Sequence, residues 1–297
     1  MSARAKRRIL LGLVGHPIAH SAAPAAHEAL AQAVGLEAFY HLIEVPGAGR
    51  EGLRSILDGV RATGFAGVNI TYPYKEMAAG LVDELSPDVA AMGAINTVVI
   101  SAGRLIGHNT DMSGFRTAYD RFVGLRGPRS VALFGAGGVG RAIAHALARP
   151  GGPVLRLYDP DRVKAEDLAG RLPGTAVLTS SVEEAIDGVE AIINATPLGM
   201  APDKRSPVPP ALIEASHLVI EVVYSPLFTP LLTAAHRQGA RYMTGRDLFV
   251  HQAIDAFRLF TGLEGSESAV GAAFDRVMAG RQSPSAAEGA DGRRRAG

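Results

Sequence analysis

A glycine-rich turn between an apolar strand and a helix is the feature that most constrains the fold of this chain. Residues 131–140 read Val-Ala-Leu-Phe-Gly-Ala-Gly-Gly-Val-Gly, so that Gly135, Gly137 and Gly140 form the pattern G-x-G-x-x-G. A helical stretch, a second apolar strand and then Asp159 follow, the acid lying about 20 residues beyond the last glycine. Strand, turn, helix, strand and acid in this order predict a dinucleotide-binding βαβ unit.

Each glycine of the turn has a physical role in such a unit. Gly135 permits the tight turn, Gly137 lets the backbone approach a pyrophosphate, and Gly140 lets the helix pack on the strand. A helical stretch is expected from Arg141 to Arg149, with Gly138 and Val139 in the turn just before it. Its unpaired N–H groups and the positive end of its dipole favour phosphate binding there.

The acid after the second strand indicates which dinucleotide binds. Asp159 can accept hydrogen bonds from the two ribose hydroxyls of NAD, and it repels the 2′-phosphate of NADP, which prefers an arginine. Arg162 follows closely and leaves some use of NADP open. Asp159 could also cap the next helix, in the run Tyr-Asp-Pro-Asp. We expect NAD as the cofactor and NADP as the weaker alternative.

Composition excludes several classes of protein. The chain has 297 residues, of which 47% are hydrophobic and 20% charged, as in an ordinary globular enzyme of one large or two medium domains. A formal net charge of +1 gives no support for nucleic-acid binding. The absence of cysteine excludes disulfides, thiolate metal sites and cysteine nucleophiles. No apolar run is long enough for a membrane helix, and we expect a cytoplasmic protein.

Strand-like and helix-like segments alternate along the chain, which predicts an α/β fold with mostly parallel sheets. The segment 281–297 is rich in Ser, Pro, Ala, Gly and Arg and is expected to be a disordered tail. We expect strands at 9–14, 39–45, 67–71, 96–101 and 104–107, then at 131–134, 154–158, 176–179, 191–195, 218–223 and 241–243, with a linker helix at 111–122 and C-terminal helices at 247–260 and 267–278.

Polar clusters follow several of these strands. His16, His20 and His27 invite a metal hypothesis, but prolines interrupt the segment and no carboxylate completes a ligand set, so we expect no metal site. Ser21 can offer its hydroxyl to a substrate there. Lys75 ends the run Asn-Ile-Thr-Tyr-Pro-Tyr-Lys, where it is either a solvated cation or, if partly buried, a group that exchanges a proton near neutral pH.

Two further clusters are Gly-Ala-Ile-Asn-Thr at 93–97 and Gly-His-Asn-Thr-Asp at 107–111. Taken alone, their polar residues are expected to cap a helix. Together with 15–21, 69–75, the glycine turn, Asn-Ala-Thr-Pro-Leu-Gly-Met at 194–200, Val-Tyr-Ser-Pro at 223–226 and Gln-Ala at 252–253, they form an ordered set. In this set the chain resembles the shikimate/quinate dehydrogenase family from about residue 10 to 274. Because the chain has Asp159 and no arginine-rich phosphate loop, it is more similar to the NAD-using branch of this family.

The resemblance implies a reversible hydride transfer between a nicotinamide cofactor and the C3 oxygen of shikimate or quinate. Lys75 would shuttle the proton on that oxygen, and Asp111 would orient the lysine and the hydroxyl. The implied substrate domain comprises 1–112 and 246–280, and a Rossmann-type doubly wound parallel sheet at 113–245 is inserted into it. The other implied contacts are Ser21, Thr71, Asn96, Tyr224 and Gln252 with the substrate, and Thr196, Met200 and Gly245 with the cofactor.

One position departs from the family pattern. Ala23 stands where the family usually has a second hydroxyl residue, so one hydrogen bond to the substrate carboxylate is missing. A hydrogen bond to a charged group contributes about 1.5–3 kcal/mol, so affinity for plain shikimate could be weak. Two alternatives therefore stay open: a dehydrogenase of an amino-substituted or otherwise altered acid, and a non-catalytic NAD-sensing module. The sequence leaves a monomer or a homodimer open.

Overall fold

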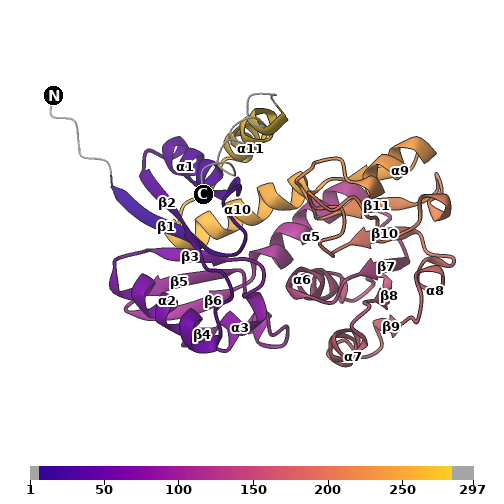
Figure 1. Ribbon diagram of the computed structural model, residues 1–297, viewed down its shortest axis with the longest axis horizontal. Coiled ribbons are helices and arrows are strands. Elements are labelled where there is room, and N and C mark those ends of the chain that lie inside the picture. The colour runs from indigo at the N-terminus through magenta and orange to yellow at the C-terminus, as the bar shows by residue number, and fades with distance from the viewer. Residues whose placement is uncertain (1–6, 283–297) are drawn as a thin grey trace, which may run out of the picture.

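The computed structural model describes residues 7–282, which form two six-stranded sheets, each with helices on both faces (Figure 1). Two long helices, α5 and α10, lie between the two lobes in Figure 1 and pack on each other. The contact is close at Gly114 of α5, where a side chain would clash with the backbone of Gln252. The bounds of these helices are α5 Thr110–Val123 and α10 Gly245–Thr261.

The first sheet has the strand order β2-β1-β3-β5-β6-β4. β1 pairs in parallel with β2 and β3, whereas β5 is antiparallel to both β3 and β6. A tight turn at Ala102 and Gly103, both with positive φ, joins β5 to β6 and requires that antiparallel pairing. The strands are β1 Arg8–Gly15, β2 Glu37–Glu44, β3 Gly67–Ile70, β4 Glu84–Leu85, β5 Thr97–Ser101 and β6 Arg104–His108.

Helices cover both faces of the first sheet. On one face, α1, α10 and α11 share a core with β1 and β2, and on the other, α2 and α3 share a core with β3, β5 and β6. The sequence did not predict α3 or the two-residue β4, because both elements are too short to show a repeating spacing of apolar residues. The bounds are α1 Ala23–Ala33, α2 Arg50–Ala62, α3 Lys75–Ala79, α4 Pro87–Ala90 and α11 Glu267–Gln282.

The second sheet is entirely parallel, in the order β12-β11-β10-β7-β8-β9. This is the doubly wound Rossmann order. The order in which strands are added to the sheet reverses between β7 and β10, and such sheets bind ligands at that point. The α/β class and the Rossmann-type sheet are therefore confirmed. The elements are β7 Ser130–Phe134, α6 Gly138–Leu147, β8 Val154–Tyr158, α7 Arg162–Gly170, β9 Ala176–Leu178, α8 Val182–Ile186, β10 Ala191–Asn194, η1 Pro210–Leu212, β11 Leu218–Glu221, α9 Pro230–Gln238 and β12 Arg241–Met243.

The C-terminal helix is longer than expected. Residues 281 and 282 belong to α11, so the expected start of a tail at 281 is wrong, and the rest of that segment, 283–297, lies outside the described residues. The apolar residues at 270, 274 and 278 are buried on one face of α11. The last turn that follows them is polar, so composition did not indicate that the helix extends to it. The two sheets match the two expected halves, while the boundaries at 112, 113, 245 and 246 stay a prediction.

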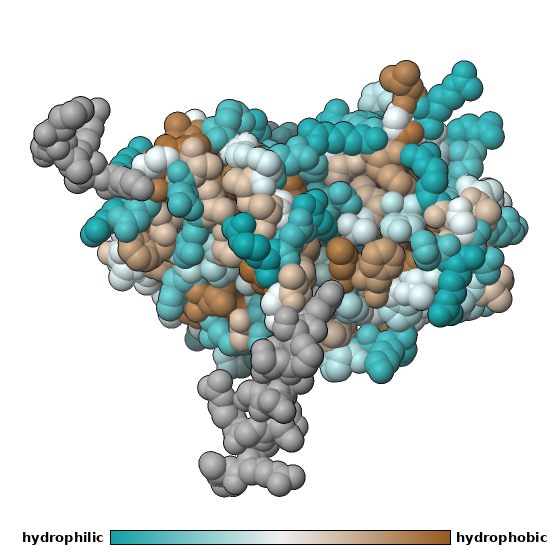
Figure 2. Space-filling view, turned by 90° about the horizontal axis from the view of Figure 1, so that it is seen from above, coloured by the Kyte–Doolittle hydropathy of each residue, from teal (hydrophilic) through white to brown (hydrophobic). Residues whose placement is uncertain are grey.

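Among residues 7–282, no helix is long and apolar enough to cross a membrane. In the view from above, hydrophobic side chains are interspersed with hydrophilic ones (Figure 2). Large apolar side chains gather instead in four buried clusters, two in each lobe.

Candidate active site

Lys75 and Asp111 form a nearly buried ion pair. The Lys75 Nζ lies 2.5 Å from Oδ2 of Asp111, and the two side chains are 12% and 9% exposed. Lys75 opens α3 just after β3, and Asp111 lies in the first turn of α5 just after β6. Because β3 and β6 both run antiparallel to β5, their carboxyl ends meet at one edge of the sheet. The fold thus brings together the lysine and the acid that the family resemblance paired, whereas their local patterns also allowed a solvated cation and a helix cap.

A network of buried amides and hydroxyls supports this edge. The Asn96 side chain donates to Thr110 Oγ1 at 3.0 Å and accepts from the Thr110 backbone N–H at 2.7 Å. The Asn69 amide donates to Thr97 Oγ1 at 3.0 Å. Asn109 caps α5 by accepting from the Met112 N–H, so the cap is Asn109 rather than Asp111, whose carboxylate is left for Lys75.

Three other expected substrate residues reach the same edge from separate elements. The Thr71 N–H donates to the carbonyl of Val14, which places Thr71 between the ends of β1 and β3. Gln252 lies on α10 against Gly114 of α5. Gly114 is about one helical turn beyond Asp111 in the same helix. Ser21 follows the β1 loop and precedes α1.

Tyr224 joins this group from the other sheet. It follows β11, and its ring contacts the rings of Phe249 and Phe274. Burial raises the pKa of its phenol, while the nearby Arg281 cation and a hydrogen bond with Ser21 oppose that rise. The Tyr224 phenol therefore lies close to the Ser21 hydroxyl.

The glycine turn has the geometry expected from its sequence. Gly135 has a φ of +103°, a backbone angle that residues with a side chain rarely adopt. A Cβ at Gly140 would lie 1.9 Å from the Gly135 carbonyl oxygen. Space around Gly137 is open, and no side chain caps α6. The first turn of α6, at Gly138 and Val139, thus offers free N–H groups to an anion.

Asp159 is held against the glycine turn. Its Oδ2 accepts from the Ala136 N–H at 2.7 Å, and its Oδ1 accepts from the Asp161 N–H at 2.8 Å. Asp161, and not Asp159, caps α7, which begins at Arg162. The expectation that Asp159 could cap this helix is wrong, because its carboxylate turns back toward β7.

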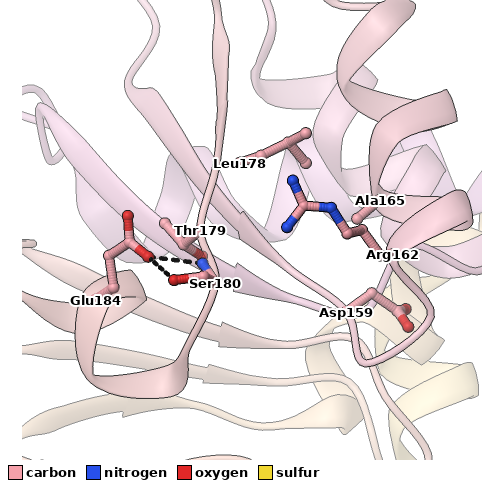
Figure 3. A pocket seen from close by; sticks show the side chains of 7 residues that line it. All are labelled: Asp159, Arg162, Ala165, Leu178, Thr179, Ser180 and Glu184. Carbon is pink, nitrogen blue, oxygen red and sulfur yellow. Dashed lines mark hydrogen bonds between the residues drawn. The ribbon is translucent and has the colours of Figure 1, made fainter.

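A pocket opens beside Asp159, between α7 and the segment after β9 (Figure 3). Arg162 reaches across it toward Leu178, while its Nε pairs with Glu166 at 2.8 Å. Glu184, on the far side, accepts from the backbone and hydroxyl of Ser180. The pocket has the place and polarity that an adenosine ribose would need.

The Lys75–Asp111 pair and the glycine turn lie next to each other. A Cβ on Gly138 would lie 3.0 Å from Cβ and Cδ of Lys75. Arg141, on the same helix, pairs with Asp167 at 2.7 Å and reaches Glu76 at 3.8 Å. The aliphatic part of the Lys75 side chain thus lies against the glycine turn at the boundary between the two sheets.

Comparison with known proteins supports the same interpretation. The shikimate dehydrogenase substrate binding domain family matches residues 13–98, and the coenzyme F420-dependent NADP oxidoreductase family matches residues 130–224. The quinate/shikimate dehydrogenase (NAD(+)) of Corynebacterium efficiens is 41% identical over 266 residues, covering 86% of this chain and 94% of that protein. The chain belongs to the shikimate/quinate dehydrogenase family.

Other members of the family differ in their cofactor. A shikimate dehydrogenase (NADP(+)) of Thermococcus kodakarensis is 38% identical, covering 90% of this chain and 97% of that protein. The quinate dehydrogenase of Corynebacterium glutamicum, solved in complex with NAD, has a TM-score of 0.84 and 38% identity, covering 91% of this chain and all (100%) of that one. Membership in the shikimate/quinate dehydrogenase family therefore leaves NAD and NADP both possible.

The cofactor-side residues expected from the family motifs follow β10 and β12 of the second sheet. Thr196 lies against Gly135, where an added Cβ would be 3.0 Å from its methyl group. Gly245 begins α10 and packs on the carbonyls of Val222 and Val223, immediately before Tyr224. Met200 is 42% exposed on the loop after Thr196.

Sequence patterns did not indicate Glu221, whose side chain links several segments on the cofactor side of the site by hydrogen bonds. Its fully buried carboxylate accepts from Asn194 Nδ2, the Val223 N–H and the Thr229 hydroxyl at 2.8–3.0 Å. Asn194 in turn accepts from the backbone and hydroxyl of Thr196. Burial raises the pKa of Glu221 to about 7 against those hydrogen bonds. The acid at the end of a strand was the only available signal.

Tyr40 and His27 were also missed as supports of the substrate side. The Tyr40 hydroxyl donates to Asn69 Oδ1 at 2.8 Å, and its ring stacks on His27 at 4.7 Å. Burial raises the pKa of Tyr40, with a contribution from Tyr224, and lowers that of His27 to about 3. A neutral His27 on α1 is a core residue in this shikimate/quinate dehydrogenase fold. Among residues 7–282, no three potential metal ligands converge.

Proposed function

We propose that this protein is an NAD-linked dehydrogenase that transfers hydride reversibly at C3 of shikimate or quinate. The observation that carries the proposal is the 2.5 Å ion pair of Lys75 and Asp111 beside the glycine turn. An amine and a carboxylate shielded from water have little use on a protein that only binds a nucleotide. They are suited to moving a proton on a substrate oxygen.

The residues around the glycine turn fit a nicotinamide dinucleotide. The uncapped start of α6, with Gly137 facing open space, suits a pyrophosphate, and Asp159 suits an adenosine ribose. Thr196, Met200 and Gly245 would continue the binding surface toward the nicotinamide. When bound, the dinucleotide supplies the acceptor or donor of the hydride.

The proton is handled by the chain itself. In oxidation, the Lys75 amine takes the proton from the C3 hydroxyl, and in reduction the ammonium returns it. Asp111 holds the amine in one position, and the amine in turn holds the C3 oxygen, which aligns the C–H bond for transfer. Because both side chains are largely shielded from water, their electrostatic interaction with the substrate is strengthened.

The ring hydroxyls and the carboxylate require several polar partners. We assign Asn96 and Gln252 to the hydroxyls, together with Thr71, and Ser21 and Tyr224 to the carboxylate. These five come from the substrate domain and from the loop after β11, so a bound acid contacts both lobes. We retain 1–112 with 246–280 as the substrate domain and 113–245 as the nucleotide domain.

NAD is preferred over NADP because of the charge of Asp159. A 2′-phosphate would lie beside this carboxylate, whose oxygens already accept from Ala136 and Asp161 and cannot turn away without breaking those bonds. Arg162 is paired with Glu166. The solved relative from Corynebacterium glutamicum carries NAD.

A substrate panel tests the proposal. Shikimate, quinate and an amino-substituted shikimate are each offered to the purified enzyme with NAD and with NADP. We expect turnover of shikimate or quinate, faster with NAD. No turnover of either acid, with good turnover of a third, would reject the substrate assignment in favour of an altered acid, the alternative that Ala23 suggests.

Absence of any turnover, with NAD still bound, would favour the NAD-sensing alternative. The ion pair of Lys75 and Asp111 argues against it, because a sensor needs neither group. A cytoplasmic location and a monomeric or homodimeric state stay predictions of the sequence.

A further inference from the structure

We propose that Arg281, in the last turn of α11, binds the substrate carboxylate and supplies the contact that Ala23 does not. This inference rests on the proposed function, since it concerns the acid group of that substrate. It assigns a role to a residue that composition placed in a disordered tail.

The packing of α11 brings its last turn to the start of α1. Gly265, just before α11, lies against Leu30 in the second half of α1, where an added Cβ would be 2.8 Å from Leu30 Cδ2. Farther along α11, Phe274 contacts the Tyr224 ring. The two helices therefore run antiparallel, and α11 ends where α1 begins, next to Ser21. Figure 1 shows α1 and α11 in the upper part of the same lobe.

The Arg281 side chain points along this contact. Its guanidinium donates to Ser225 Oγ at 3.2 Å, and it lies 3.7 Å from the sulfur of Met278. Its positive charge also acts on the Tyr224 phenol, which itself shares a hydrogen bond with Ser21. Cation, phenol and hydroxyl are thus grouped at one place.

The guanidinium is without an acidic partner in the described part of the chain. No salt bridge within residues 7–282 includes Arg281, and its side chain contacts the neutral groups of Ser225 and Met278. A partly buried guanidinium retains donors that match the two oxygens of a carboxylate. An anion at this point would complete its hydrogen bonding.

The start of α1 favours the same ligand. Ala22 and Ala23 provide no side-chain cap, and Pro24 lies in the first turn. Ser21 Oγ accepts from the Ala23 N–H at 3.2 Å and also shares a hydrogen bond with the Tyr224 phenol. The positive end of the helix dipole adds to the charge of Arg281. The guanidinium and the helix end therefore favour a carboxylate over a neutral group.

The test compares the acid with its uncharged methyl ester. Shikimate and methyl shikimate are assayed with NAD on the wild type, Arg281→Gln, Arg281→Lys and the control Arg276→Gln, an exposed arginine of the same helix. Arg281→Gln should raise KM for the acid about 10- to 100-fold with kcat nearly unchanged, because a charge-assisted hydrogen bond is lost in ground and transition states alike. KM for the ester should stay within about twofold, a change of under about 0.5 kcal/mol.

Arg281→Lys should recover part of the affinity for the acid, and raised salt should weaken acid binding in the wild type more than in Arg281→Gln. Equal losses for acid and ester, or no loss for either, would overturn the inference, since a structural role affects both compounds alike. If the wild type turns over neither shikimate nor quinate, the proposed function fails. The role of Arg281 is then decided by the dissociation constants of the same two compounds, measured by calorimetry.

Discussion

The amine of Lys75 and the carboxylate of Asp111 meet at 2.5 Å although 36 positions separate them in the chain. Their meeting depends on the order of β3, β5 and β6 in the first sheet, which puts the ends of β3 and β6 at one edge. The same edge faces the glycine turn of the second sheet through Gly138. The site is thus assembled from two lobes, and each of its parts can be tested separately.

Lys75→Ala should nearly abolish turnover while NAD still binds. Loss of a positioned acid–base group lowers kcat about 10²- to 10⁴-fold, and the amine makes no expected contact that holds the dinucleotide. Asp111→Asn should lower kcat in the same way by removing the charge that orients Lys75. Steady-state kinetics and calorimetric titration of NAD measure the two properties.

The matched control for this pair is Lys204→Ala, a change at an exposed lysine. It should leave kcat unchanged. Full activity in Lys75→Ala would remove the lysine from the mechanism.

Asp159→Asn should reduce the preference for NAD. The substitution keeps an acceptor near the ribose and removes the negative charge that repels a 2′-phosphate. We expect the ratio of kcat/KM with NADP to that with NAD to rise about tenfold or more, corresponding to about 1.4 kcal/mol. Asp187→Asn, after α8, is the control and should leave the ratio unaltered. An unchanged ratio in Asp159→Asn would argue that the acid serves only the turn.

Gly140→Ala should destabilise the nucleotide domain and weaken NAD binding. The new Cβ would lie 1.9 Å from the backbone oxygen of Gly135, so α6 would have to move away from β7. Such overpacking costs about 1–3 kcal/mol. Gly59→Ala, inside α2 with open space around it, should instead stabilise by about 0.5–1 kcal/mol. Urea unfolding and NAD titration of both variants check the contrast, which would vanish if Gly140 had no packing role.

Glu221 should make stability depend on pH. Burial raises its pKa from the usual 4.5 to about 7, so the folded protein favours the neutral carboxyl. Its stabilising contribution is complete below about pH 4.5 and is lost as the pH rises toward 7, by about 3 kcal/mol in all. In Glu221→Gln this loss is absent, because the amide does not titrate.

The measurement is the free energy of unfolding in urea at several pH values from 4.5 to 8. The wild type should lose about 3 kcal/mol relative to Glu221→Gln over this range. Glu183→Gln, at an exposed position of α8, should follow the wild type. Parallel curves for wild type and Glu221→Gln would contradict the assignment.

Some of the functional residues carried a local signal, and others did not. Gly135, Gly140 and Asp159 stand in a motif whose spacing encodes its own geometry. Tyr40 lies in an ordinary strand pattern, and nothing local indicates that its hydroxyl reaches Asn69. The polar composition around Arg281 did not indicate a helix. The last turn of α11 forms because the helix is stabilised mainly by packing on α1 and not by the helix propensity of its own residues.

The sequence by itself determined the α/β class, the Rossmann-type unit and the family, because periodicity and motif spacing act over short stretches of chain. It also predicted β8 and β12 to their end residues. Only the tertiary structure decided how closely Lys75 approaches Asp111, that Asp159 accepts from Ala136, and that Arg281 lies beside Tyr224. These contacts join elements distant along the chain, and their formation depends on strand order and helix packing, which no local pattern specifies.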